Sequence, residues 1–70
     1  YFVLGSDTIT IPDPATLPDG AVFDFVREAA ELPTIDAGTN NVTTRLGLTD
    51  GIIMGLSQSE LIVRNGLYEV

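Results

Sequence analysis

Short runs of apolar or alternating residues recur along the chain. Thr8–Ile11 alternates polar and apolar side chains with the period of two that is typical of a half-buried strand. Pro12 ends this run, because proline has no N–H to donate to a strand ladder. We predict further strands at Phe2–Leu4, Val42–Leu46, Ile52–Leu56, Leu61–Arg64 and Leu67–Val70.

Turn-forming residues separate these runs. Pro12–Gly20 holds three prolines and closes on a Pro-Asp-Gly sequence, so we predict a loop there. Asp50-Gly51 is typical of a tight hairpin, here between Val42–Leu46 and Ile52–Leu56, and Asn65-Gly66 has the same chemistry. Turns that recur roughly every eight to twelve residues are the pattern of a small sandwich or barrel.

The segment Ala21–Leu32 fits two different elements. Its polar residues fall at helical spacing and Pro33 follows as a stop, so periodicity alone favours a helix. As a strand, the same segment places Phe23 and Phe25 on one face. The helical interpretation makes the chain an α+β domain with one helix at about residues 20–32, and the strand interpretation makes it all-β.

Size and composition leave few means of holding such a fold together. Seventy residues with 44% hydrophobic side chains form one small domain, whose core alone seldom supplies more than about 3–5 kcal/mol. The chain has neither cysteine nor histidine, so disulfides and the usual zinc ligands are missing. Association with other chains is the stabilising device that remains, and we expect an oligomer.

The charge of the chain excludes one class of partner. Ten acidic residues against three arginines give a net charge of −7, and phosphate binding relies on clustered lysine and arginine, so we exclude nucleic acid. No apolar run approaches the roughly 18–20 residues of a membrane span, so we predict no membrane insertion. The excess of acidic residues is explained most simply by a solvated, soluble surface. The functional interpretation of the same charge is a surface that binds one basic partner.

Candidate chemistry is sparse. The serines have no histidine or lysine to act as a base, and no pair of acids is singled out, so we predict no enzyme, no catalytic residue and no cofactor. Asp36, Asn40, Asn41 and Asp50 offer oxygens to calcium, but Asx residues beside glycine are more often turn formers, and we assign no metal.

Aromatic side chains are the candidates for surface contact. We expect the three phenylalanines to fill the core, because so small a core has few large side chains at its disposal. Tyr1 and Tyr68 carry polar tips and are the candidate residues for contact with a receptor.

Several strings of residues resemble a known family. Ile9–Pro12, Leu17–Phe25, Pro33–Ala37 and Asn65–Val70 look like the small β-modules of bacteriophage tail fibres and tailspikes. Ile11 and Tyr68 depart from that pattern, where the family often has leucine and tryptophan. The resemblance implies a trimeric, mostly antiparallel β-domain that lies in the virion outside the cell and serves as a connector or a receptor-contacting tip. It also implies a strand within Ala21–Leu32.

Taken together, these observations predict an all-β domain over residues 1–70, a small antiparallel sandwich or barrel that is a fragment of a longer fibre protein. We expect it to form a homotrimer through the apolar faces of Ile52–Leu56 and Leu61–Val63 and to attach to a receptor such as a bacterial surface glycan. The alternative is an acidic, non-enzymatic interaction domain that binds a basic partner, with Ala21–Leu32 helical.

Overall fold

The computed structural model describes residues 2–70, and within them the chain is built from strands and one turn of 3₁₀ helix. The elements are β1 (Phe2–Leu4), β2 (Thr8–Thr10), η1 (Pro14–Thr16), β3 (Val22–Arg27), β4 (Thr34–Asp36), β5 (Val42–Thr44), β6 (Gly47–Thr49), β7 (Gly51–Ile53), β8 (Gln58–Arg64) and β9 (Leu67–Glu69). The predicted all-β class is confirmed. Tyr1 lies outside the described residues.

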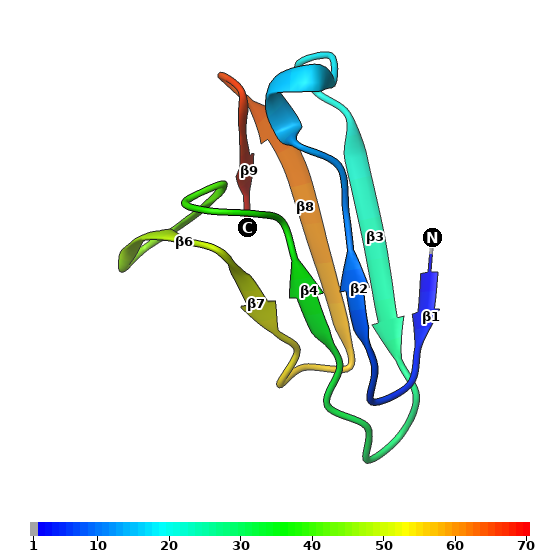
Figure 1. Ribbon diagram of the computed structural model, residues 1–70. Helices are drawn as coiled ribbons and strands as arrows, with labels where there is room; N and C mark the ends of the chain where they lie inside the picture. The colour runs from blue at the N-terminus through cyan, green and yellow to red at the C-terminus, as the bar shows by residue number, and fades with distance from the viewer. Residues whose placement is uncertain (1) are drawn as a thin grey trace.

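The strands form two sheets that pack face to face (Figure 1). The larger sheet has the order β1-β3-β8-β9-β5-β6, and the smaller has the order β2-β4-β7. Both sheets are mixed: β1–β3, β2–β4 and β5–β9 are parallel pairs and the other pairs are antiparallel. The pairs β1–β3 and β2–β4 are parallel because the chain alternates between sheets from β1 to β4, so successive strands of one sheet run in the same direction. The sandwich is therefore not purely antiparallel.

The segment that fitted both a helix and a strand is a strand. In β3, Phe23 lies opposite Leu61 and Phe25 opposite Ser59 of β8, while β1 pairs with the other edge of β3. Phe25 is fully buried and stacks on Phe23, with ring centroids 6.3 Å apart. The helical alternative at residues 20–32 is wrong, because pairing on both edges and burial of the phenylalanine face outweigh the helical spacing of the polar residues.

The core lies between the two sheets. It contains the buried residues Leu4, Ile11, Phe25, Ile35, Ala37, Val42, Met54, Leu61, Val63 and Tyr68. Tyr68 is among the largest fully buried side chains, and its ring meets Phe23 edge-on at 5.9 Å. Its hydroxyl donates a hydrogen bond of 2.7 Å to the carbonyl oxygen of Pro12, which ties β9 to the loop after β2.

Of the two predicted hairpins, one is confirmed and one is wrong. Asn65 and Gly66 have φ angles of 53° and 76° and join β8 to β9, as a tight hairpin requires. Asp50-Gly51 instead carries the chain from the larger sheet to the smaller one, since β6 pairs with β5 and β7 pairs with β4. A side chain at Gly51 would collide with the carbonyl oxygen of Ile35, so glycine serves close strand approach there.

Candidate functional site

Neither predicted tyrosine contact is available at the described surface. Tyr68 has 0% exposed surface and is a core residue, so the prediction that it contacts a receptor is wrong. Its ring fills the space between Phe23 and the loop after β2, and burial raises the pKa of its phenol. Tyr1 lies outside the described residues. Phe2 is the aromatic ring with appreciable exposure among residues 2–70, but it stacks on Phe25 with centroids 5.5 Å apart.

The four Asx residues considered for calcium lie around one pair of loops and bind their backbone. An Oδ1 atom of Asp36 accepts from the amide of Gly38 at 3.0 Å, and one of Asp50 accepts from the amide of Asn40 at 2.9 Å. The Asn41 side-chain amide donates to the carbonyl of Ala37 at 2.7 Å. Across residues 2–70, no three acidic side chains lie close enough together to hold a metal ion. These residues form turns.

A groove of about 380 Å³ lies over the smaller sheet. Its lining is Thr8, Thr34, Ile35, Asp36, Thr49, Asp50, Gly51, Ile52 and Ile53. Three threonines with two aspartates supply hydroxyl and carboxylate oxygens to the groove. Because one oxygen of each aspartate is held by a backbone amide, the carboxylates are fixed in direction. The groove offers hydrogen-bonding groups to a polar ligand.

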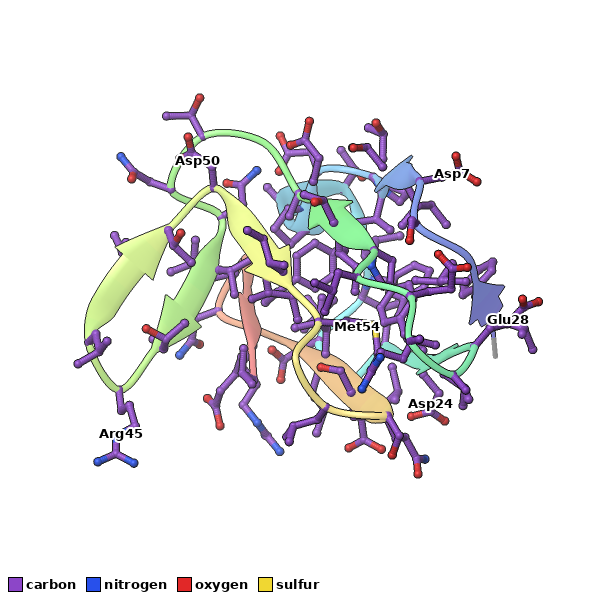
Figure 2. The ribbon with its side chains drawn as sticks, turned by 90° about the horizontal axis from the view of Figure 1, so that it is seen from below. Asp7, Asp24, Glu28, Arg45, Asp50 and Met54 are labelled. Carbon is purple, nitrogen blue, oxygen red and sulfur yellow. The ribbon has the colours of Figure 1, made fainter. Side chains whose placement is uncertain are left out.

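A second hollow, of about 210 Å³, is mainly apolar and lies beside the end of β7. Its lining is Ile52, Ile53, Met54, Gly55, Leu56, Gln58, Ser59 and Val70. Met54 is buried and points into the middle of the molecule (Figure 2). Around it Ile53, Leu56 and Val70 are 71%, 76% and 62% exposed, and we name these three side chains the aliphatic rim.

The aliphatic rim changes the predicted association surface. Ile53 and Leu56 belong to the predicted segment Ile52–Leu56 and are exposed. Leu61 and Val63 of the second predicted segment are buried in the core of their own chain, so that part of the prediction is wrong. The reason is the alternation of β8, which turns these two side chains inward toward the smaller sheet.

Leu56 is displayed on a loop whose backbone is held in place. The guanidinium Nε of Arg27 donates to the Leu56 carbonyl at 3.0 Å, and the Arg27 amide donates to the Ser57 carbonyl at 3.0 Å. A further bond of 2.7 Å joins the same guanidinium to the carbonyl of Glu31. Two bonds from Arg27 of β3 therefore hold the backbone at Leu56 and Ser57, and the third bond, to Glu31, holds the guanidinium itself in place.

Charged side chains gather on the outer face of the larger sheet. Asp24 of β3 lies directly opposite Glu60 of β8. Hydrogen bonding between the two side chains raises the pKa of Glu60, and the negative charge of Asp24 and a smaller loss of hydration raise it further. Arg64, also on β8, pairs with Glu69 and not with Glu60: its Nε atom lies 4.0 Å from Oε1 of Glu69. Asp24 and Glu60 thus form a like-charged pair across two neighbouring strands.

In the part of the chain that the structure describes, no helix is long and apolar enough to cross a membrane. No family model, no curated protein and no solved structure matches the chain. The resemblance to tail-fibre modules therefore rests on its short residue strings, and function has to be argued from the surfaces described above.

Proposed function

We propose that this domain is a non-enzymatic structural or receptor-binding module of a phage tail fibre or tailspike, and that it assembles as a homotrimer through the aliphatic rim. The proposal is supported by the residue strings Ile9–Pro12, Leu17–Phe25, Pro33–Ala37 and Asn65–Val70 and by the exposure of the rim. The rim is the observation that carries it, because three large aliphatic side chains surround one apolar hollow.

The magnitude of the burial supports association. Fully burying one leucine, isoleucine or valine side chain contributes roughly 1.5–3 kcal/mol relative to leaving it exposed. The three rim residues are between 62% and 76% exposed, so covering them is worth about 3–6 kcal/mol per chain on that scale. This is comparable with the roughly 3–5 kcal/mol that the core of so small a domain supplies. The value for the rim is a gross burial energy, from which the loss of translational and rotational freedom on association must be subtracted, whereas the value for the core is a net stability.

Attachment to a host is the second part of the proposal. The groove over the smaller sheet presents the hydroxyls of Thr8, Thr34 and Thr49 beside the carboxylates of Asp36 and Asp50. Hydroxyl and carboxylate oxygens are suited to the many hydroxyl groups of a bacterial surface glycan. Ile53 lines both the groove and the second hollow. In this proposal Ile53 is covered by the other copies together with the rest of the rim, and the threonine hydroxyls and aspartate carboxylates of the groove face outward from the virion.

Oligomeric state in solution tests the assembly part. We expect native mass spectrometry of the chain to give three copies. Replacement of rim residues in the double variant Ile53→Ser with Leu56→Ser should give a single chain, because it removes most of the exposed aliphatic surface of the rim. Leu46→Ser is the matched control: Leu46 is 94% exposed in the turn between β5 and β6 and lies outside the rim. A control variant that dissociates as readily as the rim variant contradicts the choice of surface.

Binding to cells or to an array of bacterial glycans separates the connector from the receptor-binding tip. A tip should bind, and Thr34→Val should weaken that binding because it removes a hydroxyl from the groove while keeping the shape of the side chain. Thr16→Val removes a hydroxyl from η1, outside the groove, and should leave binding unchanged. If the unmodified domain binds neither cells nor glycans, the domain is a connector and not a receptor-binding tip.

A further inference from the structure

The outer face of the larger sheet has no covering layer within residues 2–70. The smaller sheet covers the inner face alone (Figure 1). The register of β1, β3 and β8 places aliphatic and acidic side chains together on the uncovered side. The side chains of β1, β3 and β8 on this side, each exposed or half-buried, are Val3, Val22, Asp24, Val26, Gln58, Glu60, Ile62 and Arg64. An uncovered sheet face of this composition is a candidate docking surface.

Among residues 2–70, no arginine forms an ion pair with Asp24 or Glu60, the acidic pair of this face. Arg64 lies beside Glu69, and Arg27 is committed to backbone carbonyls near Leu56 and Glu31. Arg45, in the turn between β5 and β6, lies far from Asp24 in Figure 2. The three arginines account for every cationic side chain of the sequence. Two carboxyl groups directly opposite each other across neighbouring strands repel one another, so the pair attracts a positive charge from elsewhere.

The negative charge of the chain disfavours binding of a second copy of this chain to the outer face. Each copy carries a net charge of −7, and its own outer face presents the same acidic pair. Two such faces brought together would place four carboxyl groups in one interface, which costs several kcal/mol for like charges. The complementary occupant is therefore a different chain with positive charge.

We propose that the outer face of the larger sheet binds a basic polypeptide segment, with a lysine or arginine side chain between Asp24 and Glu60 and aliphatic side chains on either side. The arrangement along the strands supports this pattern. Val22 and Ile62 lie two residues from the acidic pair in one direction and Val26 in the other. Two residues of a strand span about 6.6–6.8 Å, which is also the spacing of alternate side chains in an extended peptide.

The inferred partner is thus an extended segment in which a basic residue stands between two aliphatic residues at alternate positions. This inference does not rest on the proposed function, because the rim and the outer face are different surfaces. The rim residues lie on β7, on the loop after it and at the end of β9, whereas the acidic pair lies on β3 and β8.

The test is binding of a short capped peptide in which one arginine stands between two valines at alternate positions, measured by fluorescence anisotropy at low ionic strength. A second peptide carries citrulline, which keeps the shape of arginine without its charge. We expect the arginine peptide to bind at least about tenfold more tightly than the citrulline peptide, as loss of a charge pair predicts. Equal binding of the two peptides would overturn the proposal.

Variants of the chain locate the contact. The double variant Asp24→Asn with Glu60→Gln should weaken binding of the arginine peptide by about tenfold or more. Glu28→Gln removes an acidic group from the end of β3 and is the matched control, which should bind within about twofold of the unmodified chain. A loss in the control as large as in the double variant would mean general attraction to an acidic protein and would overturn the site.

Native mass spectrometry of the double variant completes the test. We expect the same number of copies as in the unmodified chain, because the occupant is another molecule. A higher number of copies in the variant would mean that the face is a contact between copies held apart by charge, and it would overturn the inferred partner. Failure of the rim to form a trimer leaves these measurements unaffected, so the two proposals fail separately.

Discussion

Removing the hydroxyl of Tyr68 tests the assignment of this residue to the core. In the fold, the hydroxyl donates a 2.7 Å hydrogen bond to the Pro12 carbonyl and the ring is fully buried. Tyr68→Phe keeps the ring and deletes the bond. Pro12 lies at the surface, so its carbonyl oxygen can bind water in the variant. The expected loss is therefore near the ordinary value for one hydrogen bond, about 1 kcal/mol, and not the larger cost of a buried orphan acceptor.

The assay is thermal or urea unfolding followed by circular dichroism. For a domain of this size, about 1 kcal/mol corresponds to a fall in Tm of roughly 4–8 °C. Tyr68→Ala removes the ring as well and should cost about 3–5 kcal/mol, most of the stability that so small a domain has. The reasoning is refuted if both variants unfold at the same temperature as the unmodified chain, because a tyrosine at the surface would give that result.

Three further substitutions test other parts of the structure. The free energy of unfolding should fall as pH rises through the raised pKa of Glu60, because the folded chain keeps a proton that the unfolded chain releases at the ordinary carboxyl pKa. Asp24→Asn removes the cause of the raised pKa. In urea titrations it should flatten the pH dependence and raise the free energy of unfolding at neutral pH. Gly51→Ala should separate β7 from β4, because the added Cβ collides with the Ile35 carbonyl oxygen. Hydrogen exchange should then show faster exchange of the backbone amides in β4 and β7. Gly66→Ala places a side chain at a φ of 76° and should cost about 1 kcal/mol in unfolding experiments.

The strands with clear alternation and clear turn residues could be predicted from the sequence. The hairpin at Asn65-Gly66 is an example, because two residues with positive φ fix the turn locally. Strand β4 could not be predicted in the same way, since its three residues contribute one inward side chain, Ile35, and are too few to establish a period. Strand β6 is equally short and begins at Gly47. The hairpin predicted at Asp50-Gly51 was wrong because the same pair of residues can form the turn of a hairpin or a turn that carries the chain to the other sheet.

Pairing between distant segments decided what the local pattern left open. For Ala21–Leu32, both a helical and a strand period fit the residues, and the register of Phe23 with Leu61 selects the strand. The acidic pair was hidden for the same reason, because Asp24 and Glu60 become neighbours through that register alone. A signal existed in the sequence for Asp24, which is the single polar residue within Val22–Val26, but none for Glu60, which stands beside Gln58 and Ser59 in β8.

The number of chains per particle in solution shows whether the aliphatic rim joins copies of this chain. Sedimentation equilibrium of the chain over a range of concentrations measures it without labels and without a receptor. We expect a mass of three chains, with the aliphatic rim covered. A mass of one chain at every concentration would contradict this expectation, and the exposed side chains of Ile53, Leu56 and Val70 would then need another explanation.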